Sequence, residues 1–214
     1  MSASLYPLFL NLQGRTCVVI GGSEMAEGKV RDLLDAAAKI QLIAPDVTPQ
    51  IEDWSRVGKL HWQPRPYQRG DLADAFLVIS IADAETNAQV FEEAEARHIF
   101  CNAVDDIPHC SSYASAVVRR GPLQIAISTA GNSPALAQRL RKEIAERFGE
   151  EYGPWVHQLG ELRRQLLRDQ GMNLETRRKM FHVQASTSAF ESFRALLPKQ
   201  PHSIRTKPPI PTAD

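Results

Sequence analysis

The chain has 214 residues with 25 basic and 25 acidic side chains, and this length can bury a large core without a disulfide or metal. Its three cysteines show no paired spacing, which predicts free thiols in a reducing compartment. No run approaches the ~18 apolar residues of a membrane span, and no basic and apolar leader opens the chain. We therefore expect a cytoplasmic protein without a membrane partner.

The charges are divided unevenly along the chain. Residues 1–113 contain 9 basic and 16 acidic residues, and residues 114–214 contain 16 and 9. A basic second half favours an anionic partner. A nucleic acid is not expected, because the basic residues are not interleaved with aromatic residues and show no helix-turn-helix pattern.

The first half alternates between strand and helix patterns. An apolar run at 16–20 breaks at a glycine pair and continues as a helix, whose buried stripe we predict from six apolar residues: Met25, Ala26, Val30, Leu33, Leu34 and Ala37. Further strands are predicted at 40–44, 60–63, 76–81 and 99–101, and helices at 48–57 and 85–97. This alternation predicts a parallel, right-handed, doubly wound sheet.

The pattern changes after residue 113. Two β-rich runs at 113–118 and 123–128 flank a turn and predict a hairpin. A helix is expected at 135–148, with Ser133 as N-cap and Pro134 as its first residue. Helices at 151–168 and 174–196 follow, and the proline-rich segment 198–214 is predicted to be a disordered tail. The fold class is thus α/β, with a Rossmann-like sheet, a hairpin and helix, and a small helical domain.

The glycine pair resembles a dinucleotide-binding turn. Gly21 and Ala26 match the first and last positions of G-x-G-x-x-G/A, but Ser23 takes the middle one, where its Cβ would crowd a phosphate at the helix start. An ordinary turn without a ligand is the alternative. NAD is preferred to NADP because no Arg or Lys follows the second strand, where Asp46 could accept a ribose hydroxyl or simply cap the next helix.

Two carboxylates, Asp105 and Asp106, follow the strand predicted at 99–101. This place is the carboxyl edge of the sheet, where open α/β folds bind ligands. The pair could also do no more than begin a turn. His109 and Cys110 lie nearby in sequence, but two such residues without further spaced ligands predict no metal site.

Four motifs in order resemble one family: GGSEMAEGK at 21–29, AP at 44–45, NAVDD at 102–106 and ISTAGNSPA at 127–135. The chain is similar to the precorrin-2 dehydrogenases, which include the N-terminal part of siroheme synthase and bifunctional dehydrogenase/ferrochelatases. The resemblance implies an NAD-binding domain at 1–113, a dimerisation segment at 114–150 and a helical domain at 151–197 of a homodimer. The implied reaction is NAD-dependent oxidation of precorrin-2 to sirohydrochlorin in siroheme biosynthesis, with ferrochelatase activity left open.

The resemblance also implies roles for individual residues. Asp105 matches the family's catalytic aspartate, a base for the proton that leaves when a hydride passes to NAD. The residues expected to bind NAD are Gly21, Gly22, Ser23, Glu24, Met25, Pro45 and Asp46. Those expected to bind the polycarboxylate tetrapyrrole are Ser128, Thr129, Asn132, Ser133, Arg119 and Arg120. The basic residues could instead form a solvated face.

A second interpretation stays open because Ser23 and Ile81 depart from the family pattern. The chain would then be a tetrapyrrole-binding carrier, chelatase or regulatory protein that has lost its NAD-dependent activity.

Overall fold

The computed structural model describes residues 5–169 and 171–197. The tail predicted to be disordered, 198–214, lies outside these residues. Contacts divide the chain into two units. The first contains the described residues up to Ala116 together with Ile127–Arg139, and the second contains Val117–Ala126 together with the described residues from Leu140 onward.

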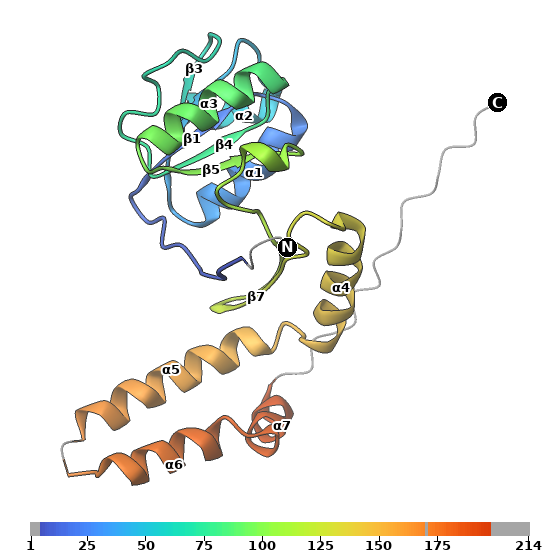
Figure 1. Cartoon of the computed structure of the whole chain (residues 1–214). Helices are drawn as coiled ribbons and strands as arrows, with labels where there is room; N and C mark the ends of the chain where they lie inside the picture. Colours follow the sequence, from blue (N-terminus) through green and yellow to red (C-terminus); the bar gives the residue numbers. More distant parts are fainter. Residues whose placement is uncertain (1–4, 170, 198–214) are drawn as a thin grey trace. The chain divides into compact units, whose positions relative to one another are not determined.

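The first unit is built on a five-stranded parallel sheet with the order β3-β2-β1-β4-β5 (Figure 1). Its strands are β1 (Thr16–Ile20), β2 (Lys39–Ile43), β3 (His61–Gln63), β4 (Leu77–Ser80) and β5 (Phe100–Ala103). The order reverses between β1 and β4, and such a reversal opens a crevice at the carboxyl ends of the two strands. The predicted doubly wound sheet is confirmed.

Helices cover both faces of this sheet. They are α1 (Glu24–Asp35), α2 (Pro49–Arg56) and α3 (Ala84–Ala96), and a short 3-10 turn, η1 (Ile107–His109), follows β5. On one face, α1 and α2 pack against alternate residues of β1 such as Val19. On the other face, α3 packs against the residues between them, such as Val18. Continuous apolar strands are therefore buried on both sides.

The buried stripe of α1 is narrower than the prediction. Ala26, Val30 and Leu33 are buried, but Met25 is 48% exposed. Adjacent helical residues are about 100° apart, so Met25 cannot share the stripe centred on Ala26. Ala37 also lies outside the stripe, because α1 ends at Asp35 and Ala37 is exposed with a φ of 55°.

The remaining chain forms a hairpin and four helices. The hairpin pairs β6 (Ala116–Arg120) with β7 (Leu123–Ile127), and the helices are α4 (Pro134–Arg147), α5 (Tyr152–Arg168), α6 (Leu174–Gln184) and α7 (Thr187–Leu196). The prediction of one helix over 174–196 is wrong. Helix α6 ends before Ala185, which is its C-cap. The Ser186 hydroxyl then accepts a hydrogen bond from the backbone N–H of Ala189 and caps α7.

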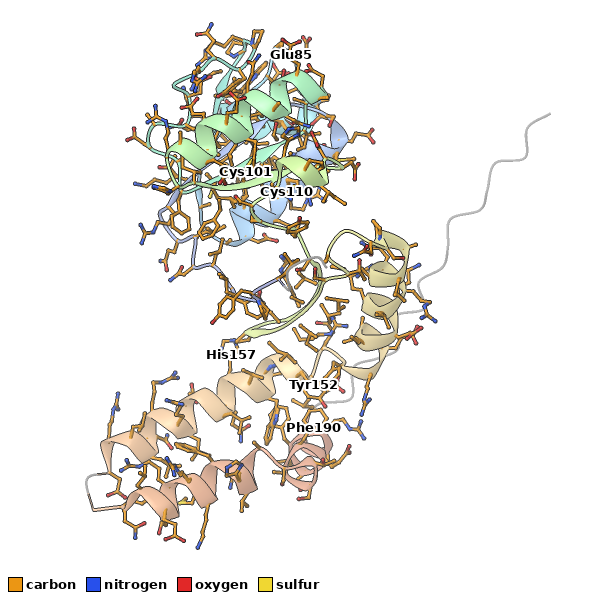
Figure 2. All side chains as sticks on the ribbon, in the orientation of Figure 1. Glu85, Cys101, Cys110, Tyr152, His157 and Phe190 are labelled. Atoms are coloured by element: carbon orange, nitrogen blue, oxygen red, sulfur yellow. The ribbon has the colours of Figure 1, made fainter. Side chains whose placement is uncertain are left out.

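Aromatic residues form the core of the second unit. Tyr152 of α5 stacks on Phe190 of α7 with ring centroids 4.3 Å apart (Figure 2). Trp155 is buried against the same Phe190 ring. Within residues 5–169 and 171–197, no helix is long and apolar enough to cross a membrane.

Candidate functional site

Two glycines shape the turn after β1. Gly21 has a φ of 115°, and a Cβ there would collide with the carbonyl oxygen of Ile81. A Cβ on Gly22 would collide with the carbonyl oxygen of Asp46, and the Gly22 carbonyl accepts a hydrogen bond from Thr48 N–H at 3.0 Å. The turn is thus packed tightly between the chain segments that leave β4 and β2.

The start of α1 offers free backbone donors beside this turn. Ser23 is the N-cap, but its hydroxyl is exposed and caps no N–H group. Among the described residues, none accepts a hydrogen bond from the N–H groups of Glu24, Met25 and Ala26. Unpaired N–H groups at the positive end of a helix bind phosphate groups. The residues present therefore fit a dinucleotide.

The segment after β2 lies next to the glycine turn. Pro45 and Asp46 are both exposed there. The alternative that Asp46 caps α2 is wrong, because the Thr48 hydroxyl is the cap and accepts from Ile51 N–H at 3.3 Å. The Asp46 carboxylate is thus left for another partner.

Asp105 lies in the turn that follows β5, at the carboxyl edge of the sheet. Its φ is 61°, a left-handed conformation that is uncommon outside glycine but several-fold enriched in Asp and Asn. Its side chain is exposed, and no group in the described chain donates a hydrogen bond to its carboxylate. Asp105 therefore presents a free proton acceptor at this edge.

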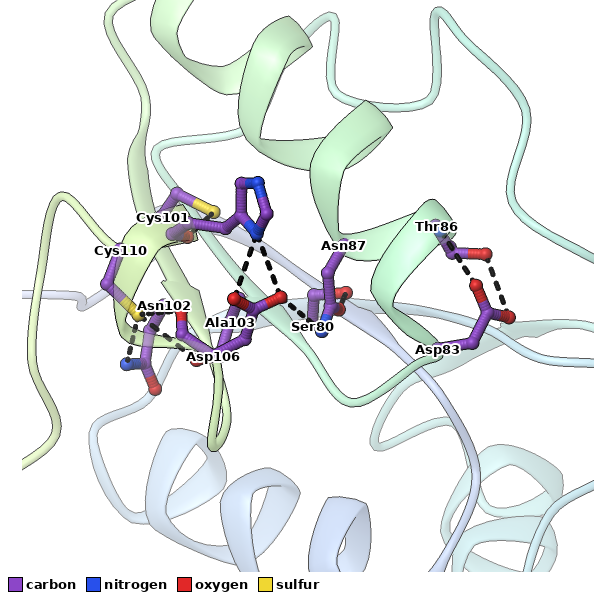
Figure 3. Close-up of polar contacts among 10 residues, drawn as sticks. Ser80, Asp83, Thr86, Asn87, Cys101, Asn102, Ala103, Asp106 and Cys110 are labelled. Carbon is purple, nitrogen blue, oxygen red and sulfur yellow. Dashed lines mark hydrogen bonds and ion pairs between the residues drawn. The ribbon is translucent and has the colours of Figure 1, made fainter.

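Asp106 has a different environment, although it is the next residue. Its carboxylate accepts from Asn87 Nδ2 at 3.3 Å, and both of its oxygens lie 2.9 Å from Nδ1 of His109 (Figure 3). Asn87 Oδ1 accepts in turn from the Ser80 hydroxyl at 2.7 Å. Ser80 is fully buried and Asn87 is 3% exposed. This chain of contacts anchors the turn that carries Asp105.

Two thiols, those of Cys101 and Cys110, lie near the end of β5 and η1. Burial raises the pKa of Cys101 to about 12 and also raises the pKa of Cys110. The Cys110 thiol donates to the carbonyl oxygen of Ala103 at 3.0 Å. Both are therefore protonated, weakly reactive thiols at neutral pH. In the described part of the chain, no three His, Cys, Asp or Glu side chains gather where they could hold a metal ion.

A pocket of ≈ 490 Å³ opens within the first unit beside Asp105. Its wall comes from the turn after β5, residues 113–116, the turn after β7, the first turns of α4, and Lys29 of α1. Three residues predicted from the sequence line it: Asp105, Ser128 and Thr129. The structure thus brings the predicted base, Asp105, and two of the residues predicted to bind the substrate, Ser128 and Thr129, together around one pocket.

The other residues of the substrate turn have local roles. Asn132 donates to the carbonyl oxygen of Thr129 at 2.9 Å, and the Ser133 hydroxyl accepts from Leu136 N–H at 3.2 Å. Ser133 is therefore the N-cap of α4, as predicted. Asn132 and Ser133 are not among the residues that line the pocket.

The two predicted arginines belong to the second unit, whereas every residue that lines the pocket belongs to the first. The side chain of Arg120 is 16% exposed, and its guanidinium group donates to the carbonyl oxygens of Phe148 at 2.7 Å and Ala145 at 3.0 Å. Arg120 thereby caps the carboxyl end of α4. Arg119 lies exposed on β6.

Two residues of the site escaped the sequence reasoning. Lys29 lies in the predicted α1 helix but lines the pocket, and Asn87 joins Ser80 to Asp106 from the first turn of α3. Lys29 ends the motif at 21–29, which gave it no role. Otherwise each residue is only a polar position beside a buried helical stripe, a signal that solvent-facing residues share.

Family models match most of the chain. A family described as "Putative NAD(P)-binding" matches residues 8–116, and one described as "Sirohaem biosynthesis protein central" matches residues 120–147. Siroheme synthase 1 of Aeromonas hydrophila is 39% identical over 158 residues, 73% of this chain and 34% of the relative. Siroheme synthase of Xylella fastidiosa is 34% identical over 202 residues, 94% of this chain and 41% of the relative.

This chain thus spans well under half the length of these relatives. Among solved structures, SirC, precorrin-2 dehydrogenase, shares the fold with a TM-score of 0.72 and 24% identity, over 89% of this chain and 98% of that one. The match at residues 8–116 covers just over half of the chain, the part that carries the glycine turn and Asp105. The chain belongs to the siroheme synthase N-terminal family, that of the precorrin-2 dehydrogenases.

Proposed function

We propose that this protein is an NAD⁺-dependent dehydrogenase that oxidises precorrin-2 to sirohydrochlorin in siroheme biosynthesis. The observation that carries the proposal is the free carboxylate of Asp105, which lines a pocket at the same sheet edge as the glycine turn. A dehydrogenase needs a hydride acceptor and a base near one substrate, and this edge offers a place for both.

The cofactor would lie at the turn after β1. The unpaired N–H groups of Glu24, Met25 and Ala26 would bind its diphosphate, with Gly21 and Gly22 keeping the backbone accessible. Asp46 would accept a hydrogen bond from a ribose hydroxyl. NAD⁺ supplies the acceptor for the hydride that leaves the substrate.

Asp105 would accept the proton that leaves the tetrapyrrole as the hydride departs, so that one carbon–carbon double bond forms. The Ser128 and Thr129 hydroxyls accept backbone N–H groups at 3.1 Å, from Ala130 and Ser133. Their own O–H groups are thus directed away from these bonds and can donate to a substrate carboxylate. Substrate binding by Arg119, and a homodimer contact through residues 114–150, stay predictions for the assembled protein.

An anaerobic assay of precorrin-2 with NAD⁺, read by tetrapyrrole absorption, tests this function. Asp105→Asn keeps the shape of the residue and tolerates its left-handed backbone. We expect it to reduce sirohydrochlorin formation by about 100-fold or more, while NAD⁺ binding stays unchanged. Asp74→Asn, at an exposed carboxylate of the same unit, is the matched control.

Two results would contradict the proposal. Near-normal turnover by Asp105→Asn would show that Asp105 is not the general base. Failure of the wild-type protein to bind NAD⁺ up to millimolar concentrations would reject the dehydrogenase and favour a carrier or a chelatase.

A further inference from the structure

The pocket beside Asp105 has a marked charge pattern. Among its lining residues Lys29 is the only lysine or arginine, and it shares the wall with Asp105 and Asp106. Lys29 lies on α1 between Ala26 and Val30, both fully buried, and is itself half-buried. The aliphatic part of the Lys29 side chain therefore begins at the edge of the helix–sheet contact, and the residue forms part of the pocket wall.

The ammonium group of Lys29 has no partner in the part of the chain that the structure describes. No carboxylate or carbonyl oxygen within residues 5–169 and 171–197 pairs with it. By contrast, Arg31 on the same helix pairs with Glu27 at 2.9 Å. An unpaired cation on the wall of a pocket is available to an anionic ligand.

We infer that Lys29 is a substrate-binding residue, whose ammonium group binds a peripheral carboxylate of the tetrapyrrole in this pocket. The inference rests on the proposed function and adds to it a residue that orients the substrate. A polycarboxylate that enters the pocket meets the negative charges of Asp105 and Asp106, which oppose its binding. One fixed cation on the wall offsets this repulsion and favours the orientation that brings a carboxylate to α1.

The position of Lys29 favours substrate over cofactor. The free N–H groups proposed for the diphosphate belong to Glu24, Met25 and Ala26, in the first turn of α1. Lys29 lies three to five residues further along the helix and shares a pocket wall with Asp105. The assignment thus predicts a loss of tetrapyrrole affinity with NAD⁺ affinity retained.

The experiment measures dissociation constants of sirohydrochlorin and of NAD⁺ by anaerobic absorption and fluorescence titration. Lys29→Met should raise the dissociation constant of sirohydrochlorin about tenfold or more and change that of NAD⁺ by less than about twofold. Lys29→Arg should restore most of the affinity, since it keeps the charge. Added salt should weaken wild-type binding more than binding by Lys29→Met.

Lys39→Met is the matched control, because Lys39 is an exposed lysine at the amino end of β2, opposite the pocket edge. Equal sirohydrochlorin affinity in wild type and Lys29→Met would overturn the inference alone, as would a shift confined to NAD⁺. Failure of the wild-type protein to bind sirohydrochlorin would overturn the proposed function and this inference together.

Discussion

Replacing Asn87 with alanine removes the side chain that joins two groups beneath the Asp105 turn. The fully buried Ser80 hydroxyl loses its acceptor at 2.7 Å, which costs about 1–3 kcal/mol. The bond from Asn87 to Asp106 is longer, 3.3 Å, and its loss adds roughly 1 kcal/mol. We therefore expect Asn87→Ala to lower the free energy of unfolding of the first unit by about 2–4 kcal/mol.

A double-mutant cycle with Ser80→Ala tests this reasoning. When both side chains are alanine, no hydroxyl is left without an acceptor, so the double variant should lose about 1–2 kcal/mol less than the sum of the single variants. Hydrogen exchange of peptides from β4, measured across a urea series, reports the first unit alone. Additivity within about 0.3 kcal/mol would show that the two side chains do not depend on each other, and would refute the argument.

Two further predictions concern the first unit. Burial acts to raise the pKa of Glu93, but the hydrogen bonds that its carboxylate accepts from Tyr67, Gly70 N–H and Arg97 together lower it. The contribution of Glu93 to the free energy of unfolding should be complete above the ordinary glutamate pKa of ~4.3. It should be lost as the pH falls through the lower pKa that Glu93 has in the folded protein. The difference in urea midpoint between wild type and Glu93→Gln should therefore shrink from pH 7 to pH 3, and a constant difference would contradict the sign. Gly22→Ala should abolish NAD⁺ binding and lower the thermal midpoint, because its Cβ meets a backbone oxygen. In contrast Gly28→Ala, whose Cβ meets nothing within 4 Å, should stabilise α1 by about 0.5–1 kcal/mol.

The sheet could be predicted because its signals are local. Short apolar runs separated by helical periods predict buried parallel strands, and all five were found near their expected positions. The break between α6 and α7 escaped prediction because apolar residues continue through it at helical spacing. The two helices are separated where Ser186 caps α7. A serine at that position is compatible both with an N-cap and with a continuous helix.

The site was predictable only where chain order alone brings residues together. Asp105 follows a strand of a parallel sheet, so its place at the carboxyl edge follows from the topology. The different environments of Asp105 and Asp106 do not follow from the topology, because they depend on the contacts of Asp106 with Asn87 and His109. These contacts come from α3 and η1, and nothing in the spacing of those residues distinguishes them from solvated ones.

Anion binding shows why charge counted along a sequence is a poor guide to a site. The basic second half suggested that its arginines bind the substrate, yet Arg120 donates to the last carbonyl groups of α4. Both halves of the chain line the pocket, but Lys29, the only lysine or arginine among the lining residues, comes from the acidic first half. At about 0.15 M salt, charges separated by more than ~8 Å in solvent are largely screened. A carboxylate in the pocket therefore interacts most strongly with the charges of its wall, so the charge balance of a whole half of the chain does not identify the residues that bind it.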